Sequence, residues 1–506
     1  MPRPLSLLAA LLATALLAAG CGGGSAGNAA GDPARVVPAG APVYAELLVH
    51  PQGALRANAE QVSAKLFGTA NPGAQIVAML DRAGAPRGLS YERDVKPWLG
   101  DHVGLAVTAF GKRPDGFVAA ASKDDGAAGA AVSRLLPVKR SFDGTSYRAS
   151  RDGRDAAAVV GHMVVAGTDA GVRAAIQTAH GGATLAGSAP LRRARTLVPQ
   201  NGLGFLYLDF KQVLPGIGAA SGSPQAAAVL QALDGAGIGT IAASLGVAKD
   251  LLRVQAAAVL DKAPTPHGSG ADAVAALPAD AWLGLGVGDL GDLLGGLLQR
   301  LTGGGGIGAA GVNALLDSFR QQSGIDVRRD VIAWMGRASL FLRGHSIFDL
   351  GGALVIQSKD PAATRRVIGK LAAYLRSRHK APVKPLHAPG VGAGFETSVS
   401  SLPLQVALAG NRFVAAIGGG ALGEALHPGA PLSGTAGYAD AVRMLGGTRP
   451  SLYLDAQRLG SALGLLSLAR PQLAKLEPLL SHFGVIAAGG HVDGRIARGT
   501  IVARVR

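Results

Sequence analysis

The feature of the sequence that most constrains the fold is an internal repeat, because two copies of one unit must adopt one architecture. The segment DVKPWLG, residues 94–100, recurs as DVIAWMG, residues 330–336. Further pairs of segments recur in the same order, with partners about 236 to 250 residues apart. They begin at Val37 and Leu277, Ser122 and Ser358, Leu185 and Leu432, Leu206 and Leu452, and Gly239 and Gly484. These collinear matches predict two diverged copies of a unit of roughly 230 residues.

Composition indicates where each copy begins and ends. Residues 262–270 read KAPTPHGSG, a Pro-, Gly- and Ser-rich stretch typical of a connector. We therefore expect a first repeat unit over residues 37–261, a linker over 262–276 and a second repeat unit over 277–506.

Each copy is expected to alternate short strands with Ala-rich helices. In the first copy, apolar runs predict strands at residues 43–49, 103–110, 117–122, 203–210, 240–247 and 253–260, with one bent strand or a strand pair at 156–166. Helical periodicity is found over residues 54–83, with a break near residues 71–73, and over residues 127–136 and 170–179. Hairpin-connected strands with such helices indicate an α+β fold with a mainly antiparallel sheet. Two tandem units predict a pseudo-twofold arrangement, with either joined sheets or a groove between the copies.

The N-terminus has the pattern of an export signal. Arg3 precedes an uncharged apolar run from Leu5 to Ala19, and Gly20 and Cys21 follow. A basic start, a run of roughly 15 apolar residues and a small-residue cleavage site predict a signal peptide over residues 1–20. The sequence LAAGC around Cys21 resembles the bacterial lipobox, although Ala18 stands where Leu is commoner. Cys21 is the only cysteine, so we expect it to carry a lipid; the alternative is an ordinary signal with a chance cysteine.

Residues 21–36 are rich in Gly, Ala and Ser, a composition that predicts a flexible tether between the anchor and the folded part. Lipidation at Cys21 would hold the exported chain on the extracytoplasmic face of the cell membrane. In an organism with two membranes, the outer membrane is an alternative. With its one cysteine acylated, the mature chain has no thiol for a disulfide or a metal.

The formal net charge of +16 predicts attraction to anionic lipid headgroups or wall polymers outside the cell. Export and an aromatic content of 4% argue against nucleic acid as the partner. No acidic residue lies between Asp360 and Glu396, a segment with an apolar helical stripe of Val367, Leu371, Tyr374 and Leu375. Its cations are Arg365, Arg366, Lys370, Arg376, Arg378, Lys380 and Lys384. They form either the solvated side of a sheet-packed helix or a patch that faces an anionic surface. No protein partner is identified.

Catalytic motifs are absent or unconvincing. Residues 286–291 match the dinucleotide fingerprint GxGxxG, but Gly makes up 75 of 506 residues, so chance matches are expected. No acidic residue follows at the distance that ribose recognition requires. A nucleophile-elbow pattern at residues 23–27 lies in the tether, and neither a P-loop lysine nor an HExxH motif occurs. The sequence therefore predicts no cofactor, no metal site and no enzymatic activity.

Two recurring motifs have both a structural and a functional interpretation. Trp98 and Trp334 would fill the core where a helix meets a strand, with the glycine allowing the turn and the aspartate capping it. The alternative places them at a ligand or a membrane. In the recurring LYLD segment, alternation puts Tyr207 and Asp209 on one strand face, and likewise Tyr453 and Asp455. We expect both aspartates to cap the helix that follows, with catalysis as the alternative.

Together, the opening Val-Pro-Ala, the DVxxWLG motif and the LYLD strand resemble a domain-of-unknown-function family. Its members are secreted and lipid-anchored bacterial proteins, common in actinobacteria and their relatives. The resemblance covers nearly the whole mature chain. It implies an envelope location and a shared fold, and it supplies no catalytic residues.

The leading functional hypothesis is a non-catalytic envelope lipoprotein that binds a partner or a ligand. The second is an extracytoplasmic carrier of lipid or another apolar molecule, which a continuous apolar cavity would favour. The third is an envelope hydrolase whose residues come from distant parts of the chain. A cleft with Ser-His-Asp or paired-carboxylate geometry would favour that hypothesis.

Overall fold

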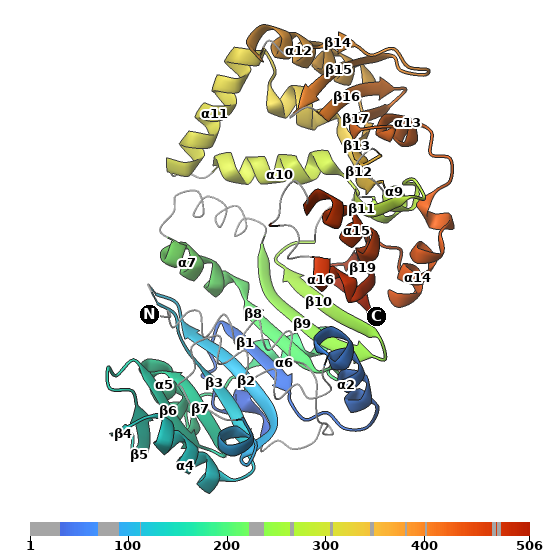
Figure 1. Cartoon of the computed structure of the whole chain (residues 1–506). Coiled ribbons are helices and arrows are strands. Elements are labelled where there is room, and N and C mark those ends of the chain that lie inside the picture. Colours follow the sequence, from blue (N-terminus) through green and yellow to red (C-terminus); the bar gives the residue numbers. More distant parts are fainter. Residues whose placement is uncertain are drawn as a thin grey trace.

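The computed structural model describes residues 31–68, 91–111, 113–221, 237–263, 268–303, 307–344, 349–379, 382–399, 402–467, 472 and 477–506. The predicted signal peptide, Cys21 and most of the predicted tether lie outside the described residues. Within the described ranges, the chain forms one antiparallel sheet with helices on both faces, so the fold is α+β (Figure 1).

The first half of the chain contributes ten of the described strands. They are β1 (Val43–Leu48), β2 (Leu99–Ala109), β3 (Asp115–Ser122), β4 (Val138–Phe142), β5 (Thr145–Ala149), β6 (Asp155–Val160), β7 (Met163–Thr168), β8 (Gly204–Asp209), β9 (Ile238–Ala248) and β10 (Leu251–Leu260). Its helices are η2 (Pro33–Arg35), α2 (Gly53–Phe67), η3 (Tyr91–Val95), α4 (Asp125–Leu135), α5 (Asp169–Ala179), α6 (Ala189–Leu197) and α7 (Phe210–Ser221).

The second half contributes the other ten. They are β11 (Ala281–Val287), β12 (Met335–Arg343), β13 (Gly351–Ser358), β14 (Lys384–Pro385), β15 (Ala393–Val399), β16 (Leu402–Ala409), β17 (Arg412–Gly418), β18 (Leu452–Asp455), β19 (Phe483–Asp493) and β20 (Ile496–Val505). Its helices are α9 (Gly270–Ala275), α10 (Leu290–Gly303), α11 (Ile307–Ser323), η4 (Val327–Val331), η5 (Ile332–Trp334), α12 (Pro361–His379), α13 (Ala421–Leu426), η6 (Leu432–Gly434), α14 (Ala436–Met444), α15 (Ala456–Ser467) and α16 (Glu477–Ser481).

The two halves have the same strand order. In the first half, the strands run β4-β5-β6-β7-β3-β2-β1-β8-β9-β10 across the sheet. Adding ten to each number gives the pairings of the second half. This shared topology is the one that two copies of one unit would form; that the halves arose by duplication stays a prediction.

Both main cores lie on one face of the sheet. In the first half, Tyr44, Phe117 and Tyr207 pack there beneath α5 and α6. In the second half, Phe341 and Tyr453 pack beneath α13 and α14. The opposite face carries α2, α4 and α7 in the first half and α10 and α12 in the second. The α15 helix also contacts the sheet, at β11, β18 and β19, and α16 contacts β19. Period-two alternation along each strand separates the side chains of these two faces.

The halves join through their last strands, because β10 pairs with β20 in antiparallel register. Two reciprocal bonds flank this pairing. Arg498 of β20 donates from Nη1 to the carbonyl oxygen of Leu197, at the end of α6, over 2.6 Å. Arg253 of β10 donates from Nη2 to the carbonyl oxygen of Met444, at the end of α14, over 2.7 Å. Of the two expected arrangements, the structure therefore has joined sheets, and each half binds a helix C-terminus of the other.

Most predicted elements of the first half correspond to observed ones, including the hairpins β2–β3 and β9–β10 and the pair β6–β7. The hairpin β4–β5 and the helix α6 were not predicted. Of the helical segment predicted over residues 54–83, with its break near 71–73, the described part is α2, which ends at Phe67. The segment predicted as a linker contains α9, and the segment predicted as a tether contains η2.

Candidate functional site

The middle of the sheet has an unusual face opposite the two main cores. Along β9, β10, β20, β19, β18 and β11, one row of side chains is in direct cross-strand register, and every member is apolar. We call this set the apolar row; it consists of Leu245, Val254, Ile501, Ala488, Leu452 and Leu285. The strands β9 and β10 belong to the first half and the others to the second, so residues of both halves build a single surface.

The apolar row is only partly covered. Ile501 is 52% exposed and Leu285 is 37% exposed, whereas the other four members are half-buried. Next to Ile501 on the same face lies Gly499, in register with Ala256. Among the described residues, a Cβ built on Gly499 meets no atom within 4 Å, so the space directly above this position is open. A continuous apolar row, unlike single exposed apolar residues, is a candidate binding surface.

Different helix positions in the two halves explain this exposure. In the first half, α2 follows β1 and packs Leu55 and Ala59 against Val247 and Leu252, on the face that carries the apolar row. In the second half, α10 follows β11 but packs Leu290 against η5 and β12 instead. The α10 helix therefore does not cover β19 in the way that α2 covers β9. Instead α15 contacts β19, β18 and β11, and Ile501 and Leu285 stay exposed.

The size of the row limits the ligands that it can bind. Six strands at a spacing of about 4.8 Å span about 24 Å. Because two facing acyl chains fill the ~30 Å hydrocarbon core of a bilayer, one chain spans about 15 Å, and the row is long enough to hold a single extended acyl chain. The backbone beneath is satisfied by the sheet ladder, and the row has no polar side chain. It therefore offers contact to hydrocarbon and no hydrogen bonds.

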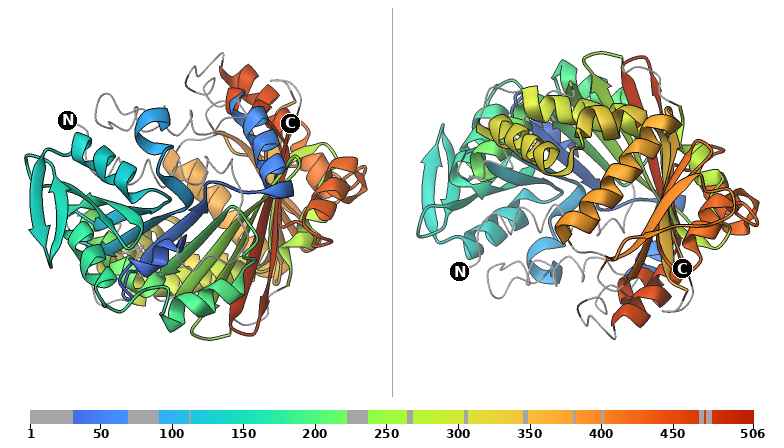
Figure 2. Two further views of the ribbon diagram at one scale, coloured as in Figure 1. Left: turned by 90° about the horizontal axis from the view of Figure 1, so that it is seen from below. Right: turned by 90° about the horizontal axis from the view of Figure 1, so that it is seen from above.

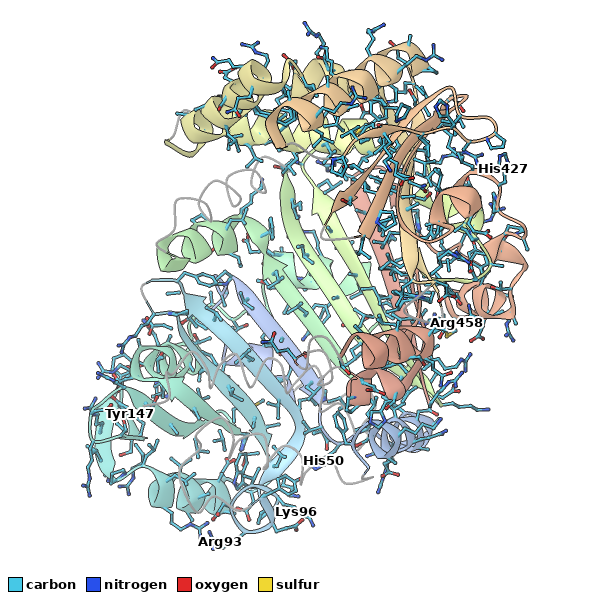
Figure 3. The ribbon with its side chains drawn as sticks, turned by 45° about the horizontal axis from the view of Figure 1, so that its top comes forward. His50, Arg93, Lys96, Tyr147, His427 and Arg458 are labelled. Carbon is cyan, nitrogen blue, oxygen red and sulfur yellow. The ribbon has the colours of Figure 1, made fainter. Side chains whose placement is uncertain are left out.

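Polar side chains gather elsewhere. Figure 3 places Arg93 and Lys96 at the edge of the first half. The predicted basic segment forms α12 and the short strand β14. Arg365, Arg366, Arg376 and Lys384 are exposed there, whereas Lys370 contacts the Asp330 carboxylate over 2.9 Å. The side chains of Arg378 and Lys380 lie outside the described residues.

The predicted apolar stripe of α12 is correct in part. Leu371 and Leu375 pack against the sheet, but the centre of the buried side is Ile368 and Ala372. Tyr374 instead meets the ring of Phe319 on α11, edge-on, with centroids 6.0 Å apart. The α12 helix therefore lies between the sheet on one side and α11 on another.

The recurring tryptophans have the expected structural role. Trp98 is 8% exposed and Trp334 is 3% exposed, and both pack in apolar clusters. Their indole Nε1 atoms donate to the carbonyl oxygens of Asp94, at 2.6 Å, and Asp330, at 2.8 Å. The same bond in both halves fixes each ring where a π-helical turn enters a strand.

The role expected for the glycine of this motif is wrong in its detail. Neither Gly100 nor Gly336 has a positive φ, so neither is required for a turn. A Cβ on Gly100 would lie 2.9 Å from the Ala121 carbonyl oxygen, and one on Gly336 would lie 2.7 Å from that of Gln357. Both glycines are therefore needed because the neighbouring strand passes too close for a side chain.

The aspartates of the motif form ion pairs. Asp94 contacts Arg93 at 2.9 Å and Arg134 at 3.0 Å. Asp330 contacts Arg329 at 2.9 Å as well as Lys370, and these cations hold the pKa of Asp330 below its ordinary value. The expected capping role is not found for Asp330: the residue that caps η4 is Asp326, and Asp330, inside η4, accepts a bond from the Asp326 backbone N–H.

The two LYLD strands confirm the capping interpretation. Asp209 accepts a bond from the Gln212 N–H over 3.4 Å, and Asp455 accepts one from the Arg458 N–H over 3.2 Å. The tyrosines belong to the two main cores, and burial raises the pKa of Tyr453 to about 12. These residues are therefore committed to the start of a helix and to the core.

The glycine fingerprint at residues 286–291 does lie between a strand and a helix, as phosphate binding requires. However, a Cβ on Gly286 would overlap the carbonyl oxygen of Gly270, and one on Gly291 would lie 2.7 Å from that of Ile332. The glycines thus accommodate other parts of this chain. Separately, the described residues contain no group of three His, Cys, Asp or Glu side chains that could hold a metal ion.

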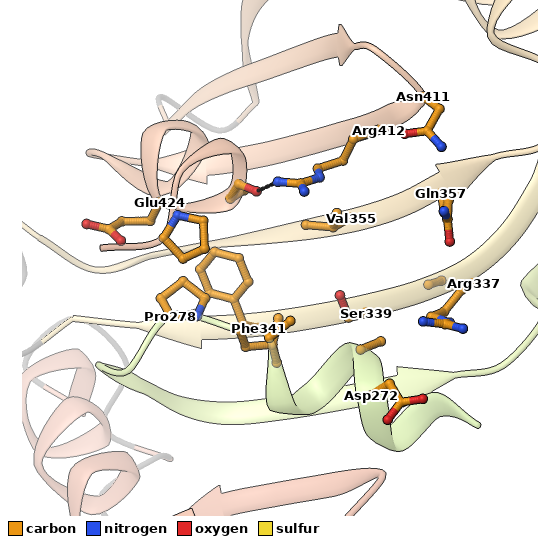
Figure 4. Close-up of a pocket in the computed structure, with 16 residues that line it drawn as sticks. Asp272, Pro278, Arg337, Ser339, Phe341, Val355, Gln357, Asn411, Arg412 and Glu424 are labelled. Carbon is orange, nitrogen blue, oxygen red and sulfur yellow. Dashed lines mark hydrogen bonds between the residues drawn. The ribbon is translucent and has the colours of Figure 1, made fainter. Parts of the chain in front are cut away.

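A hollow of about 280 Å³ lies on the core face of the second half, beside α9 and α13 (Figure 4). Apolar side chains form part of its lining, and four charged residues also line it: Asp272, Arg337, Arg412 and Glu424. Arg412 donates to the last carbonyl oxygens of α13, at 2.8 and 3.2 Å. Asp272 contacts Arg449 over 2.7 Å. Two of the four charged groups therefore serve structural contacts.

Sequence reasoning missed a polar cluster in the first half. Arg195 of α6 contacts Asp32 at 3.1 Å and Glu46 of β1 at 3.0 Å. His102 of β2 lies 2.9 Å from Glu46, which raises the pKa of the histidine above 6.5. Tyr44 donates to Glu46 over 3.2 Å. The cluster ties together segments as far apart as 163 positions, so no short motif could have indicated it.

Comparison with known proteins identifies the family to which the chain belongs. A family model described as "Protein of unknown function (DUF3352)" matches residues 5–499. No curated protein matches the chain. Three crystal forms of TP0453 are 13–14% identical to it, with TM-scores of 0.26 to 0.27; they cover 45–46% of this chain and 81–82% of TP0453. At such TM-scores the likeness carries no argument. None of the described helices is both long and apolar enough to cross a membrane.

Proposed function

The chain belongs to the DUF3352 family, and from that premise we propose that it is a non-catalytic, lipid-anchored envelope protein that holds an acyl chain on its apolar row. The observation that carries the proposal is the row itself. It is apolar across six strands, is built by both halves, and has free space above Gly499.

A hydrocarbon suits this surface better than a protein partner does. Protein interfaces combine an apolar centre with hydrogen bonds, about one per 100–200 Å². The apolar row and the adjoining Ala243, Ala256 and Gly499 have no side-chain donor or acceptor. An acyl chain makes no hydrogen bonds, and burying it gains about 0.8 kcal/mol for each CH₂. Some ten methylenes on the row would therefore give substantial affinity.

The predicted location agrees with this role. An acyl anchor on Cys21 and the Gly-rich residues after it would keep the folded part near a bilayer, where lipids are abundant. The proposal thus combines the carrier hypothesis with the envelope lipoprotein hypothesis. It assigns no reacting group, since the recurring Trp, Tyr and Asp residues all make structural contacts.

The test is mass spectrometry of organic extracts from the mature chain with Cys21→Ser, purified from bacteria without detergent. We expect co-purified lipid near one molecule per chain. Gly499→Phe should fill the space above the sheet and reduce the bound lipid about tenfold. The matched control is Gly129→Phe on α4, where a Cβ also meets no atom within 4 Å.

A chain that carries no lipid, when a known lipid-binding protein prepared in parallel does, would contradict the proposal. Equal loss of lipid in the Gly499 and Gly129 variants would contradict it as well. Circular dichroism and melting curves identify any variant that has lost its fold.

A further inference from the structure

The exposed side of α12 carries a concentration of positive charge. Arg365, Arg366 and Arg376 are exposed, and the helix has no acidic residue. Among the described residues, none of the three forms an ion pair. Lys370, on the side toward η4, differs because Asp330 neutralises it at 2.9 Å. The sequence pattern thus separates one structural cation from three that face solvent.

An apolar side chain accompanies this charge. On the adjacent α11, Leu315 is 71% exposed, the most of any large apolar residue described. The α11 and α12 helices are in contact through Phe319 and Tyr374. Figures 1 and 2 show that they lie together at one end of the molecule, uncovered in the view from that end.

We propose that the α11–α12 end of the molecule docks on an anionic lipid bilayer. The three arginines contact headgroup phosphates, and Leu315 enters the interfacial region. Charge complementarity favours an anionic partner, and the exposed leucine favours a bilayer over a polar wall polymer. Arginine suits this task because its planar guanidinium binds phosphate oxygens in pairs.

This inference does not depend on the proposed acyl-chain site. Docking uses the outside of the helices, whereas the apolar row lies on the sheet. A bilayer contact at this end would supplement the predicted anchor, because a single weak attachment is strengthened when a second one acts on the same surface.

The test measures binding of the mature chain with Cys21→Ser, so that no acyl anchor contributes. Vesicles of phosphatidylglycerol and phosphatidylcholine are compared with vesicles of phosphatidylcholine alone by co-sedimentation. We expect binding to the anionic vesicles only, and weaker binding at high salt. Each cation at an anionic surface strengthens binding about fivefold, so the triple variant R365Q/R366Q/R376Q should bind about 100-fold more weakly.

The matched control removes the same net charge from the first half. Arg113, Arg151 and Arg193 are also exposed, and R113Q/R151Q/R193Q should retain most of the binding. Leu315→Gln should weaken binding several-fold and leave its salt dependence unchanged. The α12 triple variant should keep its co-purified lipid, which separates this test from that of the acyl-chain site.

Equal loss in the two triple variants would overturn the proposal, because net charge alone would then account for the binding. Failure of the wild-type mature chain to bind anionic vesicles would overturn it too. Binding to purified anionic wall polymer that exceeds binding to vesicles, with Leu315→Gln unaffected, would assign the surface to the wall instead.

Discussion

The two halves share a strand order but differ in where the helix after their first strand packs. After β1, α2 packs against Val247 of β9 and Leu252 of β10, and it also contacts β20. After β11, α10 and α11 extend away from the corresponding strands and pack on η5, β12 and α12. The same strand order therefore allows two different positions for the helix that follows the first strand of each half. Because α10 packs elsewhere, part of the apolar row stays exposed, although α15 contacts β19, β18 and β11, and α10 and α11 add a helical layer at the end of the molecule.

A second difference lies on the core face. The strand registers place Tyr44 of β1 and Gly284 of β11 at equivalent positions, opposite Tyr207 and Tyr453. Glu46 then corresponds to Gly286. The first half has Tyr44 and the Glu46 carboxylate, which contacts Arg195 and His102. At the equivalent positions the second half has glycines, against which α9 packs. The apparent nucleotide fingerprint is thus a consequence of this close helix packing.

The largest losses of stability are expected at the buried tryptophans, which make the same contacts in both halves. Trp98→Ala and Trp334→Ala each remove a buried ring and its bond to an aspartate carbonyl, and each should cost about 4 kcal/mol of the free energy of unfolding. Denaturant titration of both variants provides the measurement. A cost below about 1 kcal/mol in one half alone would show that the two motifs are not equivalent.

The next largest loss of stability is expected at Gly286, where the second half has a glycine and the first half has Glu46. Gly286→Ala places a Cβ against the Gly270 carbonyl oxygen and should cost about 3 kcal/mol, because the backbone of α9 must move. Gly499→Ala, which meets open space, should change stability by less than about 0.5 kcal/mol. Melting curves of the two variants measure these changes in stability. Nucleotide bound to the wild-type chain would contradict the interpretation that the fingerprint glycines serve close packing.

A smaller effect is expected at the seam between the halves. Arg253→Met and Arg498→Met each leave the end of a helix without its donor from the other half, and each should cost about 1 kcal/mol. Because both contacts are reciprocal, we expect similar values. Denaturation of the single and double variants measures them, and a loss confined to one variant would argue against a symmetric seam.

The smallest effect concerns pH. Contact with Glu46 raises the pKa of His102 above 6.5, so the protonated histidine stabilises the folded state. This contribution is complete below the unfolded-state pKa and is lost as pH rises through the folded-state pKa. Wild-type stability should therefore fall slightly above pH 6.5, relative to His102→Gln. Parallel pH-dependences of the two proteins would contradict this assignment.

Local patterns predicted the parts of the fold that depend on neighbouring residues. Hairpins, helix caps at Asp209 and Asp455, and the burial of Trp98 and Trp334 follow from turns, alternation and apolar periodicity. The hairpin β4–β5 was missed because its residues, VKRSF and TSYRA, include many polar side chains and bury little.

The candidate site could not be predicted, because it depends on the pairing of strands that are far apart in sequence and on where the helix α10 packs. Val254 and Ile501 are neighbours only because β10 pairs with β20, at a separation in sequence that no motif records. The exposure of Leu285 depends on where α10 packs, and that choice is set by contacts with Trp334 and Ala338. The Arg195 cluster likewise exists only after folding.

The central claim is that hydrocarbon lies on the apolar row. Photo-crosslinking with a diazirine-bearing fatty acid, followed by peptide mapping, tests this most directly. We expect labelled peptides from β9, β10 and β20, around Leu245, Val254 and Ile501, and loss of the label in Gly499→Phe. Labels confined to the outer helices, or unchanged in that variant, would contradict the account.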